Sequence, residues 1–219
     1  MNQKPRLIVF DLDGTLIDTM GSFADTAGQL IREHYGWTFE AGRKGYLETS
    51  GIPFFQQLEV LFPRDERNGR VAELFEKMKI ENFLAERVST KTLETLHALR
   101  DLEIRTAISS NNFHDLVKEF VHRENVPVDL ALGFKPDFAK GIQHFDHLRR
   151  YFNIPFKEMV FVGDSLSDAR KAKQVGIRFV AKLGTFTEAD FRQNVNTVFF
   201  PVIWEIYELL DLLEELWTL

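Results

Sequence analysis

The stretch "LIVFDLDGTLIDT", residues 7–19, decides the fold that we predict for this chain of 219 residues. Its first four residues are apolar and indicate a short buried strand. Asp11 and Asp13 follow at once, and Gly14 and Thr15 then predict a sharp turn. Ligands of open α/β sheets bind beyond the carboxyl ends of the strands. We therefore expect the two carboxylates to lie at a binding crevice.

Apolar runs typical of strands recur along the chain, with helix-length segments between them. This alternation predicts an α/β fold, a doubly wound parallel sheet with helices on both faces. The runs are "RLIVF" (6–10), "IRTAISS" (104–110), "VDLALGF" (128–134), "EMVFVGD" (158–164), "IRFVAKLG" (177–184) and "NTVFF" (196–200), and helices are expected at about 91–101, 113–124, 141–152, 165–175 and 201–217.

One interval interrupts the alternation. Residues 17–88 show helical spacing and no convincing strand, and they are far longer than the dozen or so residues that an ordinary crossover needs. We interpret them as an all-helical cap inserted over the carboxyl edge of the sheet. Residues 1–16 and 89–219 would then form the α/β core. Turns within the cap are expected at Gly36, Gly42, Gly45, Gly51 and Pro53.

The composition narrows the range of functions. The chain has no cysteine, which excludes a disulfide framework, a thiolate metal site and a cysteine nucleophile. A net charge of −6 with mixed signs argues against nucleic-acid binding. The short apolar run near the start predicts no membrane segment, so we expect a cytoplasmic protein. The final helix has one apolar side, which favours docking on its own sheet in a monomer and leaves a homodimer open.

A second acidic pair follows a later strand. Asp164 and Asp168 lie in "FVGDSLSD", and if that strand neighbours the first one, they converge with Asp11 and Asp13. Like charges packed so closely raise one another's pKa unless a cation neutralises them. Carboxylate oxygens are hard ligands, which favours Mg²⁺ as the cofactor.

With these residues in view, the chain resembles the haloacid dehalogenase (HAD) superfamily of phosphohydrolases. The family's first motif has four apolar residues followed by Asp-x-Asp-Gly-Thr, and "IVFDLDGTLIDT" matches it throughout. The resemblance implies that Asp11 attacks phosphorus and forms an aspartyl-phosphate. It further implies that Asp13 donates a proton to the leaving group, then activates water, and binds the metal through its backbone carbonyl.

The resemblance also assigns the remaining motifs. "VGDSLSDARKAKQVG" matches the fourth, which makes Asp164 a metal ligand beside Asp11 and Asp13, and Asp168 an orienting group. The second motif, a serine that holds a phosphoryl oxygen, is assigned to Ser110 with Asn111 beside it; Ser109 is the alternative.

The third motif is a lysine that neutralises the nucleophile and the phosphoryl group. Lys140 fits the family spacing to the acidic motif better than Lys135, which is nevertheless followed by a proline as in relatives. The expected phosphate-binding residues are therefore Gly14, Ser110, Asn111 and Lys140. His144 and His147, three residues apart on an expected helix, are interpreted as a solvated helix face and not as a metal site.

We therefore expect a Mg²⁺-dependent phosphomonoester hydrolase that acts on a small soluble phosphorylated metabolite. The alternatives are a phosphosugar mutase of the β-phosphoglucomutase kind and, from another class, a phospho-acceptor or binding module. A dehalogenase is disfavoured, since that branch lacks the second aspartate. Phosphoglycolate, sugar phosphates and nucleoside monophosphates remain open as substrates. The cap residues that could recognise the leaving group are Arg43, Lys44, Thr49 and Ser50. Arg43 and Lys44 are expected to lie in a turn with solvated side chains.

Overall fold

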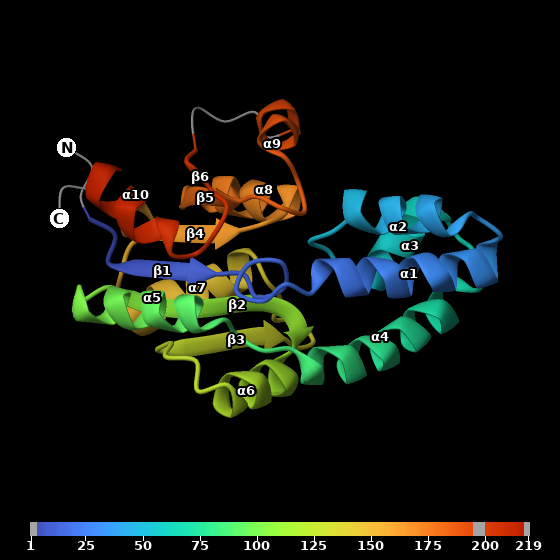
Figure 1. Cartoon of the computed structure of the whole chain (residues 1–219), viewed down its shortest axis with the longest axis horizontal. Coiled ribbons are helices and arrows are strands. Elements are labelled where there is room, and N and C mark those ends of the chain that lie inside the picture. Colours follow the sequence, from blue (N-terminus) through green and yellow to red (C-terminus); the bar gives the residue numbers. More distant parts are fainter. Residues whose placement is uncertain (1–3, 195–199, 217–219) are drawn as a thin grey trace. The chain divides into compact units, whose positions relative to one another are not determined.

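The computed structural model describes residues 4–194 and 200–216. The chain divides into two compact units (Figure 1). Residues 1–17 and 87–219 form an α/β unit, and residues 18–86 form a helical unit. None of the helices in the described residues is both long and apolar enough to cross a membrane.

The α/β unit is built on a parallel sheet with the strand order β3-β2-β1-β4-β5-β6. The pairing of β1 with both β2 and β4 places the end of "LIVF" at the centre of the sheet. The predicted fold class, a doubly wound parallel sheet, is therefore confirmed. The strands are β1 (Leu7–Phe10), β2 (Arg105–Phe113), β3 (Leu130–Phe134), β4 (Met159–Gly163), β5 (Arg178–Lys182) and β6 (Val202–Ile203).

Helices cover both faces of this sheet (Figure 1). Leu7 and Val9 point to one face because strand side chains alternate, and there they join the apolar side chains of α7, α8 and α9 in one core cluster. In Figure 1, α5, α6 and α10 lie on the near side. The helices are α5 (Thr90–Asp101), α6 (His114–Arg123), α7 (Ile142–Phe152), α8 (Leu166–Val175), α9 (Glu188–Asn194) and α10 (Glu208–Leu216), with a short 3₁₀ turn at Phe156–Glu158.

The end of the chain differs from the prediction of one helix over 201–217. Val202 and Ile203 form the edge strand β6, and α10 begins only at Glu208. The backbone N–H groups of β5 explain the difference, since Ala181 donates to the carbonyl of Pro201 and thus draws this segment into the sheet (3.0 Å). The strand expected at "NTVFF" lies outside the described residues except for Phe200.

The helical unit contains α1 (Met20–Tyr35), α2 (Phe39–Glu48), α3 (Phe54–Leu61) and α4 (Asn68–Ala85). The turns predicted at Gly42 and Gly45 are wrong, because both glycines lie inside α2. Gly42 serves close packing instead: a Cβ atom there would lie 3.1 Å from the Cα atom of Gly28 in α1. Where Gly28 and Gly42 meet, the two helices approach more closely than larger side chains would allow.

The solvated turn predicted for Arg43 and Lys44 is also wrong, since both residues lie in α2. Arg43 donates to Asp25 on α1 at 2.7 Å, and Lys44 pairs with Glu48 one turn along at 3.6 Å.

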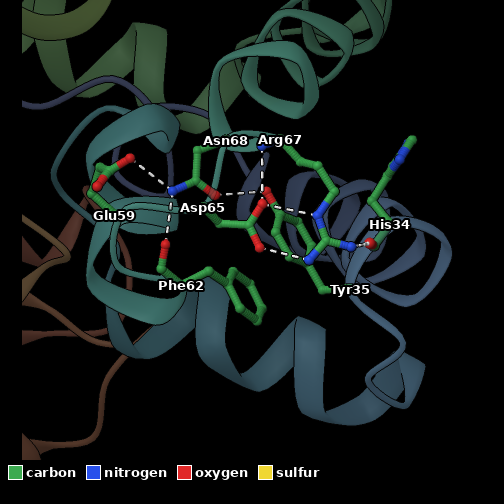
Figure 2. Close-up of polar contacts among 7 residues, drawn as sticks. All are labelled: His34, Tyr35, Glu59, Phe62, Asp65, Arg67 and Asn68. Carbon is green, nitrogen blue, oxygen red and sulfur yellow. Dashed lines mark hydrogen bonds and ion pairs between the residues drawn. The ribbon is translucent and has the colours of Figure 1, made fainter.

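A polar cluster ties three helix ends of this unit together (Figure 2). Its centre is Asn68, which is 1% exposed at the start of α4. The Asn68 amide donates to Glu59 at 2.7 Å and to the carbonyl of Phe62 at 2.8 Å, and its oxygen accepts from the hydroxyl of Tyr35 at 2.8 Å. Beside it, Arg67 binds both carboxylate oxygens of Asp65 (Figure 2).

Candidate active site

Asp11 lies directly after β1 and is buried. Its N–H donates to the carbonyl of Val162 at 2.9 Å, which continues the ladder between β1 and β4. The next residues turn sharply: the carbonyl of Leu12 accepts the N–H groups of residues 15, 16 and 17. Gly14 has φ of 75° in this turn, and its own N–H donates to the carbonyl of Ile17 at 2.8 Å. The N–H of Gly14 is therefore engaged inside the loop.

Lys140 reaches the carboxylates. Its ammonium nitrogen lies 2.9 Å from Oδ1 of Asp11 and 2.8 Å from Oδ1 of Asp168, and all three side chains are buried. The alternative lysine, Lys135, is exposed, and its backbone pairs with that of Phe138. The geometry thus brings Lys140 to the acidic cluster.

The turn from β4 into α8 holds the second acidic pair. Ser165 is the N-cap of α8; its hydroxyl accepts the N–H of Asp168 at 3.1 Å and donates to Oδ2 of Asp168 at 2.7 Å. Asp164 accepts a short hydrogen bond from the hydroxyl of Thr185. Gly163 makes room for this arrangement, because a Cβ atom there would lie 2.8 Å from the Cβ of Asp168.

The electrostatics of these residues reflect burial and close charges. Burial raises the pKa of Asp11 well above its usual value, against the opposing charge of Lys140. Burial and then the charge of Asp168 raise the pKa of Asp164 to about 7. Burial also works to raise the pKa of Asp168, but the ammonium groups of Lys140 and Lys171 outweigh it and hold that pKa below its usual value. For Lys140, burial opposes the charge, yet Asp11 and Asp168 hold its pKa above the usual value.

The opposite side of the site comes from the end of β2. The amide of Asn112 donates to Oδ2 of Asp13 at 2.8 Å, and its backbone N–H donates to the hydroxyl of Ser110 at 3.0 Å. Asn112 therefore joins the serine assigned to the second motif to the second aspartate of the first. Ser109, the alternative serine, is fully buried and contacts Nδ1 of His144 at 2.9 Å. Asn111, beside Ser110, is half-buried.

Two contacting residues were missed by the sequence reasoning. Asn112 stands next to the predicted Asn111, and only the backbone course at the end of β2 decides which amide turns toward Asp13. Thr185 follows β5, the neighbour of β4, so its position after a strand end was a signal that could have found it.

The interpretation of the histidine pair as a solvated face is wrong for one of its members. His144 has no exposed surface, packs against the ring of Phe138 and bonds Ser109. His147, one turn away, is exposed as expected. α7 packs on the sheet through Phe145 and Leu148. His144 lies on the same buried side of the helix and therefore faces the sheet.

Three carboxylates are placed to hold a cation. Asp11, Asp164 and Asp168 each offer an oxygen atom, and these atoms lie within 4.8 Å of one another. Such a donor set, made only of carboxylates, fits a hard divalent ion such as Mg²⁺. Both carboxylate oxygens of Asp168 are engaged, Oδ1 by Lys140 and Oδ2 by Ser165, whereas Lys140 contacts one oxygen of Asp11 and Thr185 bonds one oxygen of Asp164. Asp11 and Asp164 are therefore the carboxylates that best suit direct ligation.

Three known proteins are similar to this chain over most of its length. The sequence is 25% identical over 177 residues to human "Magnesium-dependent phosphatase 1", covering 81% of this chain and 77% of that protein. A candidate phosphoglycolate phosphatase from Lactobacillus delbrueckii subsp. bulgaricus superposes with a TM-score of 0.81 at 17% identity, covering 99% of this chain and 100% of that one. CbbY from Rhodobacter sphaeroides, solved with xylulose-(1,5)bisphosphate, superposes with a TM-score of 0.70 at 14% identity over 94% and 96% of the two chains.

The decisive match is to a family pattern. Residues 8–182 match the haloacid dehalogenase-like hydrolases, a span that runs from β1 through β5 and includes every residue of the acidic cluster. The predicted resemblance and the prediction of an enzyme are thereby confirmed, and the chain belongs to the haloacid dehalogenase-like hydrolase family.

Proposed function

We propose that the protein is a Mg²⁺-dependent phosphatase that hydrolyses a small phosphomonoester through an aspartyl-phosphate on Asp11. The observation that carries the proposal is the contact of Lys140 with both Asp11 and Asp168, in a cluster of buried carboxylates at the centre of the sheet. Phosphoryl transfer needs mainly positioning and neutralisation of charge, and this arrangement supplies both.

In the first step, a carboxylate oxygen of Asp11 bonds to phosphorus while the bond from phosphorus to the ester oxygen breaks. Asp13 donates a proton to the departing oxygen, so the leaving group departs as a neutral alcohol. The hydrogen bond from Asn112 at 2.8 Å supports this role, because it orients the carboxyl group of Asp13.

In the second step, Asp13 accepts a proton from water, and the water oxygen attacks phosphorus. The bond between phosphorus and Asp11 breaks, which releases orthophosphate and restores both carboxyl groups. Lys140 favours the carboxylate form of Asp11 against the effect of burial before the attack, and it neutralises the phosphoryl oxygens during it.

The metal site of the proposal consists of the side chains of Asp11 and Asp164 and the backbone carbonyl of Asp13. Their oxygen ligands suit Mg²⁺, and the name of the human relative points to the same ion. When bound, the ion would supply positive charge against the carboxylates and the phosphoryl oxygens.

The substrate class is proposed from two of the similar structures. CbbY is solved with a bisphosphorylated sugar, and the Lactobacillus relative is a candidate phosphoglycolate phosphatase, so small phosphorylated metabolites are the class to test. We assign recognition of the leaving group to the helical unit, which would act as a cap. We assign phosphate binding to Ser110 and Asn111 in the α/β unit.

The test is release of orthophosphate from a panel of phosphomonoesters, including phosphoglycolate, sugar phosphates and nucleoside monophosphates, with Mg²⁺ or with EDTA. We expect metal-dependent release by the wild type and a loss of at least about a thousandfold in Asp11→Asn, which cannot form the covalent intermediate. Asp101→Asn, at an exposed position at the end of α5, is the control and should keep full activity.

Three results would count against the proposal. Release that survives in Asp11→Asn contradicts the nucleophile, and release that is unchanged in EDTA contradicts the metal. No release from any ester, with a stable phosphate on Asp11 after exposure to a phosphoryl donor, would favour the phospho-acceptor role over a phosphatase.

A further inference from the structure

Lys171 is a charged residue near the acidic cluster that the proposed mechanism does not use. It lies on α8, three residues after Asp168, so the two side chains share one face of the helix. Helical side chains lean toward the N-terminus of their helix, and the N-terminus of α8 is the end that carries Ser165 and Asp168. Lys171 therefore extends toward the site.

The stem of this lysine packs over the backbone that carries Lys140. A Cβ atom on Gly141 would lie 3.4 to 3.8 Å from the Cδ, Cγ and Cε atoms of Lys171, which is ordinary van der Waals contact. Gly141 has φ of 121°, a conformation that favours glycine, so the stem lies against bare backbone at the start of α7. The contact joins α8 to the turn that positions Lys140.

The charges around the Lys171 ammonium group are those of the site itself. It interacts favourably with Asp168 and Asp11 and unfavourably with Lys140 and Arg170. Burial and then the charge of Lys140 lower the pKa of Lys171 to about 8, and Lys171 in turn helps to hold the pKa of Asp168 below its usual value.

We propose that Lys171 is a second cation of the phosphate site, which acts through Asp168 and Lys140 to favour the anionic substrate and to weaken binding of the divalent ion. This inference rests on the proposed phosphatase function. Lys171 is a positioning residue, because its charge acts through Asp168 and Lys140.

The physical reason is that the site must bind two ligands of opposite charge, Mg²⁺ and the phosphate group. A positive charge that interacts with the cluster attracts a phosphate dianion and repels Mg²⁺, and burial weakens the screening of both effects by solvent. The acidic cluster already attracts the metal strongly, whereas the same carboxylates repel the substrate. A second ammonium group therefore shifts the balance toward the substrate.

The experiment compares the wild type with Lys171→Met, Lys171→Arg and Lys173→Met. Methionine keeps the length and apolar stem but removes the charge, arginine keeps the charge, and Lys173 is an exposed lysine on the same helix. Calorimetric titration measures the binding of Mg²⁺ to the metal-free proteins and of orthophosphate to the Mg²⁺-loaded proteins. Steady-state kinetics on the best substrate then give kcat and KM.

We expect Lys171→Met to bind Mg²⁺ about three- to tenfold more tightly and orthophosphate about three- to tenfold more weakly. Its KM should rise more than its kcat falls, because the lost charge acts on a bound anion in both the ground state and the transition state. Lys171→Arg and Lys173→Met should stay within about twofold of the wild type in every titration.

Opposite shifts in the two affinities identify an electrostatic role, since a general loosening of the fold would weaken both. The inference is overturned if both affinities fall together, or if neither changes while the wild type binds both ligands; in the latter case the phosphatase proposal stands. If the wild type binds neither Mg²⁺ nor orthophosphate, the proposed function fails and this inference fails with it. Thermal unfolding of each variant establishes that the proteins compared are folded.

Discussion

His144 shows how one buried side chain can link two parts of the site. Its Nδ1 atom contacts the hydroxyl of Ser109 in the middle of β2, and it lies on α7 one turn after Lys140. Burial, followed by the nearby charge of Lys140, lowers the pKa of His144 to about 3. The imidazole is therefore neutral in the folded protein at neutral pH.

This neutral histidine makes the stability of the protein depend on pH. Below the ordinary histidine pKa of about 6.5, the unfolded chain takes up a proton that the folded protein does not, so the contribution is complete above that pH and is lost as the pH falls toward 3. Between pH 7 and pH 5, the free energy of unfolding of the wild type should drop by about 2 kcal/mol more than that of His144→Gln. Urea unfolding at the two pH values measures this difference.

His147→Gln is the matched control, because His147 is exposed on the same helix and its replacement should leave the pH dependence of unfolding as in the wild type. An identical decline in stability for wild type and His144→Gln would contradict a buried neutral imidazole at position 144.

At the level of single residues, the sequence was most informative where a strand runs straight into charged groups. Asp11 and Asp164 each follow a strand of apolar residues, so their place at the carboxyl edge followed from the pattern alone. The contacts of Asn112 and Lys171 did not follow. They depend on how the chain turns after β2 and on where α8 packs against α7, which no local pattern encodes.

At the scale of elements, close packing at the junction of β4 and α8 leaves no room for a side chain at position 163. Gly163 ends β4, and a Cβ atom there would lie 2.8 Å from the Cβ and 2.9 Å from Oδ2 of Asp168. In Gly163→Ala, α8 or Asp168 must move, which breaks the contact of Asp168 with Lys140. We expect a loss of stability of about 1 to 3 kcal/mol and a fall in kcat of at least about tenfold, measured by urea unfolding and phosphate release.

Gly69→Ala provides the contrast, because no atom lies within 4 Å of a Cβ placed there and Gly69 is inside α4. It should be stabilised by up to about 1 kcal/mol through its better helix propensity, with unchanged turnover. Full activity in Gly163→Ala would mean that the position of Asp168 is not needed for catalysis.

Periodicity predicted most elements of the α/β unit well, and the local signals failed in two identifiable places, the start of the last helix and the glycines of α2 in the helical unit. The helix expected at 141–152 is α7, Ile142–Phe152, because its apolar side faces the sheet at helical spacing. The last helix does not begin at residue 201 as expected, because Val202 and Ile203 pair with the edge of β5. This pairing in the folded sheet outweighs the local preference for helix. Gly42 failed as a turn signal because the close approach of α1 requires a small residue there, and Gly45 because it lies inside α2 against the side chains of Leu61 and Trp37.

At the scale of the whole molecule, the two units divide the work that we propose. Each residue of the acidic cluster belongs to the α/β unit, whereas the polar cluster around Asn68 belongs to residues 18–86. The Asn68 amide, at the start of α4, bonds groups at the ends of α1 and α3. Burial, with the charge of Asp65, raises the pKa of Tyr35 in the same cluster to about 12. The stability of the helical unit can therefore be changed without touching the residues that carry the chemistry.

Asn68→Ala tests this division. The substitution leaves the hydroxyl of Tyr35 and the carbonyl of Phe62 without their partner, at a cost of about 2 to 3 kcal/mol to the helical unit. Hydrogen exchange should speed up across residues 18–86 and stay unchanged in β1, β4 and α8, while Mg²⁺ and orthophosphate binding remain as in the wild type. Lys77→Ala, at an exposed position on the same helix, should leave exchange unaltered. Faster exchange in β1 and β4 would instead mean that the two units unfold together, because the loss of one buried amide in the helical unit would then have destabilised the sheet that carries Asp11 and Asp164.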